Sequence, residues 1–227
     1  MNAIDRIARD KLIDLINSYL SEQITAFSLD ERLEPFRDSE DSAVRFVSRA
    51  MWYHYDDCDD HLVVATKPQW NFLQRLLLLL ASNSTVIEQH HWQWSWTQPI
   101  AAILLFGCLY ITYLTGWGWH LLVFFVPFGL ASIVLSLFRF PRIERRPYDT
   151  IVSPFATVQE LHSAYKGAIG FKKRQCPEHI ASRLIRSPTM SRFYFLKSLV
   201  IWAVYAPFPL FAQCFPIRHD SARVCPG

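Results

Sequence analysis

The sequence predicts a mainly α-helical, polytopic membrane protein, and three observations support this fold class. No Asp, Glu, Lys or Arg occurs between Glu88 and Arg139. A bilayer core of roughly 30 Å needs about 20 apolar residues per helix, so this uncharged stretch suits two crossings. The chain of 227 residues is 51% hydrophobic and 15% aromatic. We expect an acidic cytosolic helical domain (1–90), a transmembrane hairpin (91–138), a basic cytosolic segment (139–197), a third transmembrane or re-entrant helix (198–217) and a tail (218–227).

Residues 1–90 begin with the pattern of an amphipathic helix. Its apolar stripe recurs at spacings of three and four residues and consists of Ile4, Ile7, Ala8, Leu12, Leu15, Ile16, Tyr19 and Leu20. Arg9 and the neighbouring charged residues lie off this stripe. Pro35 and the following FRDSEDS predict a loop, and a second helix is expected from Asp41 or Ser42.

Two further elements are expected before the membrane segment. HLVVAT, at residues 61–66, is a candidate strand or extended linker. Thr66 and Gln69 have the spacing of a capping box, in which each residue's side chain bonds the other's backbone at a helix start. The helix that follows is apolar nearly all round but too short to cross a bilayer, so it is expected in the core of this domain.

The transmembrane hairpin consists of two apolar runs, about 99–115 and 120–138. Tryptophan favours the membrane–water interface, because its ring is apolar and its N–H needs a polar partner. Trp92, Trp94 and Trp96 precede the first run, and Trp117 and Trp119 follow it, so these residues predict its two interfaces. Glycines between the runs permit a tight reversal.

The basic residues predict the orientation of the hairpin. Arg139, Arg142, Arg145 and Arg146 follow the second run directly, whereas the turn between the runs is uncharged. The positive-inside rule therefore places residues 139 onward in the cytosol. Two crossings return the chain to its starting side, so we expect a cytosolic N-terminus in a multi-pass protein of a plasma membrane, of the bacterial inner-membrane type.

Charge divides the chain into an acidic front and a basic back. Residues 1–96 hold nine Lys or Arg against fifteen Asp or Glu, and the remainder holds fourteen against five. Beside a membrane segment, anionic lipid headgroups are the expected partner of the basic part, with Lys172, Lys173, Arg174, Arg183 and Arg186 as candidates. Nucleic acid is disfavoured, because the sequence has no Gly-rich phosphate loop or aromatic RNA motif.

The segment after Lys197 is uncharged as far as Arg218 and has the length of a third crossing. Pro207 and Pro209 remove backbone donors and distort its last third. A re-entrant or interfacial segment therefore remains the alternative to a complete crossing.

One polar cluster contains every common metal ligand type within eight residues. His54, Asp56, Asp57, Asp60 and His61 are the candidate ligands, and Cys58 lies among them. The three carboxylates have DDxxD spacing, which suits Mg²⁺, and the His and Cys residues suit a transition metal. A surface turn is the ordinary explanation of such an Asp-rich segment, because Asp is a poor helix residue and a good turn residue.

The leading functional hypothesis is a non-enzymatic accessory protein that docks a protein partner or self-assembles through its cytosolic regions. No GxSxG, HExxH or Walker A sequence is present, and no cofactor is expected. One alternative is a membrane-perturbing effector or a small oligomeric channel lined by Thr112, Thr115 or Ser136. A metal-dependent enzyme centred on residues 56–61 is the other.

Overall fold

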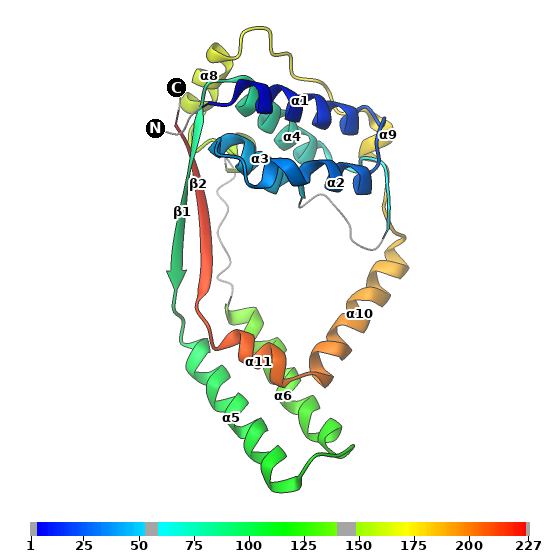
Figure 1. Cartoon of the computed structure of the whole chain (residues 1–227). Coiled ribbons are helices and arrows are strands. Elements are labelled where there is room, and N and C mark those ends of the chain that lie inside the picture. Colours follow the sequence, from blue (N-terminus) through cyan, green and yellow to red (C-terminus); the bar gives the residue numbers. More distant parts are fainter. Residues whose placement is uncertain (1–3, 53–58, 140–148, 226–227) are drawn as a thin grey trace. The chain divides into compact units, whose positions relative to one another are not determined.

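The computed structural model describes residues 4–52, 59–139 and 149–225, and the chain divides into two compact units. Unit 1 consists of Met1–Gln89, Arg145–Ile185 and Ser221–Gly227, and unit 2 consists of His90–Glu144 and Arg186–Asp220. The chain is mainly helical, as the sequence predicts (Figure 1). The chain makes two excursions from unit 1, at residues 90–144 and 186–220, and returns to unit 1 after each of them.

Four helices provide most of unit 1: α1 (Arg6–Leu20), α2 (Ala26–Arg37), α3 (Ser42–Trp52) and α4 (Lys67–Ala81). They pack side by side around a shared apolar core (Figure 1). In α4, Trp70 and every leucine from Leu76 to Leu80 are buried, which explains why this helix is apolar nearly all round. The capping box at its start is confirmed, since Gln69 Oε1 accepts from the backbone N–H of Thr66 at 2.8 Å.

The second part of unit 1 adds three short helices, α7 (Asp149–Val152), α8 (Val158–Gly167) and α9 (Glu178–Ala181). Phe155, Ala164 and Ile180 from this segment belong to the same core as α1–α4. The indole N–H of Trp70 donates to the carbonyl of Arg174 at 3.0 Å, which fixes this segment to α4. Residues 149–185 are therefore a structural part of the N-terminal unit.

Two long strands, β1 (Thr85–Gln93) and β2 (Ile217–Cys225), form a two-stranded sheet (Figure 1). Val86 near the start of β1 and Val224 near the end of β2 are both buried in the core of unit 1. Both strands were missed by the sequence analysis. The strand suggested for residues 61–66 is absent, and those residues form an extended linker into α4.

Unit 2 contains the two apolar helices of the expected hairpin, α5 (Thr97–Thr115) and α6 (Leu121–Arg139). Each is long and apolar enough to cross a membrane. The chain reverses at Gly116, whose φ of +72° is a conformation that favours glycine. The two helices pack against each other, and most of their large apolar side chains remain exposed.

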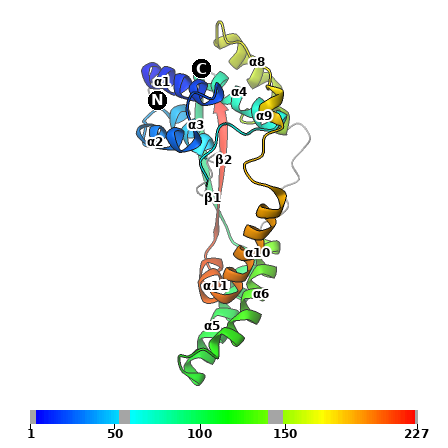
Figure 2. The same ribbon diagram turned by 90° about the vertical axis from the view of Figure 1, so that its right-hand side faces the viewer.

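The third apolar segment is a pair of helices rather than one straight helix. α10 (Pro188–Val204) and α11 (Pro207–Gln213) meet at an angle of 87°. α10 packs on α6, and α11 packs on both α5 and α6 (Figure 2). A Cβ atom at Gly129 would lie 2.2 Å from the carbonyl oxygen of Ala203, so only glycine permits this close approach of α6 and α10. Helix α10 begins at Pro188, ten residues before the expected position 198.

Three expectations about the N-terminal region need correction. A helix, α2, spans Ala26–Arg37 and includes Pro35, where a loop was expected. Ile7 belongs to the apolar stripe of α1, but 71% of its side chain surface is exposed. Arg9, expected off that stripe, is fully buried. The reasons are tertiary contacts, which are described below.

Candidate functional site

The predicted metal cluster lies only partly within the described residues. His54, Asp56 and Asp57 are outside them, as is Cys58. The Asp60 carboxylate accepts from the backbone N–H of Phe27 at 3.0 Å, and this bond is the main reason that the pKa of Asp60 is lowered. Among the described residues, no three His, Cys, Asp or Glu side chains gather as metal ligands would. Asp60 acts as a cap for α2, and metal binding stays a prediction.

The tryptophans expected at the membrane interface are exposed. Trp92, Trp94, Trp96, Trp117 and Trp119 all keep more than half of their surface accessible. The ring of Trp96 also contacts that of Phe138, so the outer ends of α5 and α6 meet here. Arg139 ends α6, whereas Arg142, Arg145 and Arg146 lie outside the described residues.

The five cationic candidates have different environments. Arg183 is used inside unit 1, since its guanidinium pairs with Glu22 and donates to the carbonyl of Val63 at 2.9 Å. This contact holds the pKa of Glu22 below its usual range. Arg186 lies over the ring of Tyr194, 4.8 Å from its centre. Lys172, Lys173 and Arg174 are exposed, and they remain candidates for an anionic surface.

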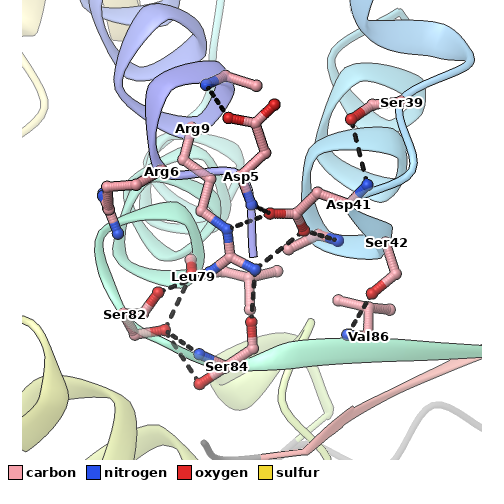
Figure 3. Close-up of polar contacts among 12 residues, drawn as sticks. Asp5, Arg6, Arg9, Ser39, Asp41, Ser42, Leu79, Ser82, Ser84 and Val86 are labelled. Atoms are coloured by element: carbon pink, nitrogen blue, oxygen red, sulfur yellow. Dashed lines mark hydrogen bonds and ion pairs between the residues drawn. The ribbon is translucent and has the colours of Figure 1, made fainter. Parts of the chain in front are cut away.

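A buried ion pair joins α1 to α3 (Figure 3). Arg9 Nε lies 2.7 Å from Asp41 Oδ2, and Arg9 Nη2 lies 2.9 Å from Asp41 Oδ1. The same guanidinium donates to the carbonyls of Ser82 and Ser84 at 2.7 and 3.0 Å. Asp41 also accepts from the backbone N–H groups of Asp5 and Ala43. Four segments of unit 1 therefore meet at this pair.

The electrostatics of the pair follow from this bonding. Burial alone would raise the pKa of the Asp41 carboxyl, but the hydrogen bonds and the charge of Arg9 outweigh it and leave the pKa lowered. Arg9 and Asp41 expose 0% and 2% of their side chains. With both charges satisfied and screened from solvent, the pair is a structural element of the unit and not a reactive site.

Unit 1 has a groove between the start of α1 and the end of α2. Its volume is about 900 Å³. Ile4 and Ile7 provide exposed apolar surface on one wall, and Phe36 lies on the other. Asp38 and Glu40 at the rim are exposed, and among the described residues neither carboxylate has a basic partner. Two cations also line the groove, Lys11 and Arg6, and Arg6 pairs with Asp10 at 2.7 Å. The lining carboxylates outnumber these cations by four (Asp5, Asp38, Glu40 and Asp41) to two, so the groove combines apolar walls with a net negative lining.

A second, smaller pocket of about 290 Å³ is lined by Arg37, Arg45 and Arg49 together with Trp52. Two of its three arginines pair with carboxylates, and Arg45 donates to the carbonyl of Ser39 at 2.9 Å. Arg37 pairs with Asp30 and Glu34 at 2.7 and 2.8 Å, and Arg49 pairs with Glu88 at 3.3 Å. Three carboxylates for three guanidinium groups leave this pocket without a net positive charge.

Unit 2 has a buried polar cluster around Ser132 of α6. The Ser132 hydroxyl donates to Gln213 Oε1 at 3.2 Å and accepts from the indole N–H of Trp202 at 3.0 Å. The Gln213 amide in turn donates to the Ser132 carbonyl at 3.0 Å. These bonds join α6 to α10 and α11. The proposed pore residues Thr112, Thr115 and Ser136 donate instead to carbonyls of their own helices.

Neither the groove nor the Ser132 cluster was predicted from the sequence. Ile4 and Ile7 carried a signal for the groove, because they extend the apolar stripe beyond what the core can cover. Ser132 and Gln213 carried a weaker one, since each is a polar residue within an apolar run. Their meeting across 81 positions could not be read from local spacing.

The fold and these sites define a class: a mainly helical protein with two helices suited to a membrane and a helical unit with its own core. No family model, curated protein or solved structure matches the chain.

Proposed function

We propose that this protein is a membrane-anchored docking protein, in which α5 and α6 cross a bilayer and unit 1 recruits a protein partner on the cytosolic side. The contrast between the two units supports the anchor. Unit 1 buries its apolar residues in one core, whereas Ile103, Phe106 and Val123 of α5 and α6 leave about 70% of their surface accessible. Apolar surface has a lower free energy in contact with lipid than in contact with water.

The shared core of unit 1 carries the proposal for the number of crossings. Residues from the first 89, from 149–185 and from the final strand meet in that core, as Leu12, Ile180 and Val224 illustrate. A single folded core lies on one side of a membrane. Each excursion of the chain away from it must therefore cross the bilayer an even number of times.

The first excursion fits two crossings, because α5 and α6 have 19 residues each and are about 28 Å long. The second excursion has helices of 17 and 7 residues. These are about 25 and 10 Å long, which is too short to cross and return. We propose that α10 and α11 form a re-entrant element, so that the C-terminal tail shares the side of unit 1. This side is the cytosol by the positive-inside rule.

Labelling of single cysteines tests this topology in the full-length chain. In a background without the natural cysteines, Lys11→Cys reports on unit 1, His120→Cys on the turn between α5 and α6, and Arg223→Cys on the tail. All three positions are exposed. A membrane-impermeant maleimide should label Lys11→Cys and Arg223→Cys from the same side and His120→Cys from the other. Labelling of Arg223→Cys from the side of His120→Cys would refute the re-entrant element.

The groove between α1 and α2 is the proposed docking surface. Its exposed isoleucines match an apolar helix face, and its unpaired Asp38 and Glu40 match basic residues beside that face. We propose that the occupant is a cationic amphipathic segment of a partner protein. Because the anchor holds unit 1 at the membrane, the partner is recruited there.

Photo-crosslinking in cells tests the groove. A crosslinker placed at Ile7 should give a discrete adduct, and one placed at Ile169, which is also exposed, should not. The double variant Asp38→Lys/Glu40→Lys should abolish the Ile7 adduct. Glu31→Lys, at an exposed position of α2 that does not line the groove, is the matched control and should preserve it. Equal adducts from both crosslinkers would contradict the proposal, and an adduct of twice the chain's mass would identify a second copy as the occupant.

A further inference from the structure

A pocket in unit 2 lies where the end of α6 meets α11. Its volume is about 260 Å³, and its lining includes Arg139, Trp202, Pro209, Gln213 and Ile217. We propose that this pocket binds the phosphate of an anionic membrane phospholipid through the guanidinium of Arg139. This inference rests on the membrane topology proposed above and adds a ligand to it.

Among the described side chains of unit 2, Arg139 has no acidic partner. Arg139 Nη1 donates to the carbonyl of Ala212 at 3.2 Å, and Nη2 donates to that of Phe215 at 2.6 Å. Both acceptors are neutral carbonyls, and the partial negative charge at the end of a seven-residue helix offsets only part of a full cation. Among the described side chains of unit 2, none is a carboxylate. The charge of Arg139 is therefore available to an anion from outside the described part of the unit.

The geometry leaves Arg139 able to bind one. A guanidinium has five N–H donors, and the two carbonyls use two of them. These two bonds also hold the side chain in one position, so little side-chain entropy is lost when a ligand binds. Phosphate oxygens match the remaining donors, because arginine and phosphate form charge-assisted hydrogen bonds.

The other walls of the pocket favour a lipid over a free ion. Trp202 and Gln213 direct their polar groups to Ser132, which leaves the indole ring, Pro209 and Ile217 as apolar surface. The Ser136 hydroxyl also lines the pocket, and it donates to the carbonyl of Ile133 at 2.6 Å. The apolar walls suit the glycerol and upper acyl carbons of a lipid, which a free phosphate lacks. Arg139 is the last residue of a candidate membrane span, and basic pockets between membrane helices at this level bind anionic headgroups.

Lipid retention by the purified full-length protein tests the site. The protein is reconstituted in nanodiscs of phosphatidylcholine and phosphatidylglycerol and is then extracted in mild detergent. Native mass spectrometry measures the mass of the protein together with any lipid that it retains. We expect one retained phosphatidylglycerol, and Arg139→Gln should weaken its binding about tenfold to a hundredfold, the size of a lost charged hydrogen bond. Arg192→Gln, which removes an exposed cation of α10, is the matched control and should retain the lipid.

A second variant keeps the test decisive if Arg139→Gln fails to fold. Ala212 is exposed and lines the pocket, so Ala212→Phe fills the space without changing any charge, and it should also lose the lipid. Equal retention by Ala212→Phe and the unmodified protein would overturn the proposal, as would release of the lipid by millimolar inorganic phosphate, which would indicate a general phosphate site. Recovery of the protein without detergent would instead refute the membrane anchor itself.

Discussion

Replacing Asp41 with Asn removes the negative member of the buried pair with Arg9. It also puts an NH₂ group in place of one of the two carboxylate oxygens that accept hydrogen bonds at this site. The two side chains have the same shape, and Asn can still accept from the N–H of Ala43 at the start of α3. Arg9 then keeps its charge in a site with 0% exposure. Breaking a buried pair in this way costs about 3–5 kcal/mol, because the remaining charge is buried without compensation.

Urea unfolding of the full-length protein in detergent, followed by pulse proteolysis, measures this cost. For a domain of this size the free energy of unfolding falls by about 2 kcal/mol per molar urea, so the midpoint should fall by roughly 2 M. Asp10→Asn is the matched control, because Asp10 pairs with Arg6 at 2.7 Å on the surface of the same helix. An exposed pair of this kind contributes about 0.5 kcal/mol, and its midpoint should hardly move.

If Asp41→Asn and Asp10→Asn shift the midpoint equally, the burial of Arg9 has no energetic consequence, and the proposed role of the pair in joining α1 to α3 is wrong. The double variant Arg9→Met/Asp41→Asn distinguishes the loss of the ion pair from the burial of an unpaired Arg9 charge. It should be more stable than Asp41→Asn alone, because no unpaired charge remains.

The same pair predicts a pH dependence, and two further predictions concern other parts of the chain. The pKa of Asp41 is lower in the folded state than in the unfolded state, where it is about 3.9. The stability that the pair contributes is therefore complete above about pH 3.9 and is lost as the pH falls from there through the folded pKa. The urea midpoints at pH 3 and pH 7 should differ less in Asp41→Asn than in the unmodified protein. Gly129→Val should separate α6 from α10, because its Cβ would overlap Ala203, and thiol labelling of the buried Cys108 should become faster. Val224→Asn should lower the urea midpoint of unit 1 by more than 1 M, because it buries an amide in the core, whereas Arg223→Asn beside it should leave that midpoint unchanged.

The two long apolar helices, α5 and α6, could be predicted from sequence because their signal is local. An uncharged run of sufficient length has one common physical meaning, and the structure has an apolar helix on each side of Gly116. The capping box at Thr66 was predictable for the same reason, since both of its partners lie within one helical turn. Wherever a few adjacent residues decide the outcome, the sequence was sufficient.

Helix α2 could not be predicted because contacts from distant residues stabilise it. Pro35 lies in its last turn, where the missing N–H removes only one bond of the helix. Its first turn is capped by Thr25 and by the Asp60 carboxylate, and Leu29 is buried in the core. Arg9 was misplaced for a similar reason. A charged residue is buried only when a partner compensates it, and Asp41 lies 32 positions away.

The two strands depend on the longest pairing in the chain. β1 contains Gln89, His90 and His91, which do not have the apolar alternation of a strand, and its partner lies in the C-terminal tail. Such a pairing forms only after both excursions of the chain have been made. The core of unit 1 consequently depends on residues that are synthesised after α5 and α6, including Ile180 and Val224. Folding of unit 1 is thereby coupled to the placement of the apolar helices, because a chain that fails to return from either excursion leaves Val86 and its neighbours uncovered.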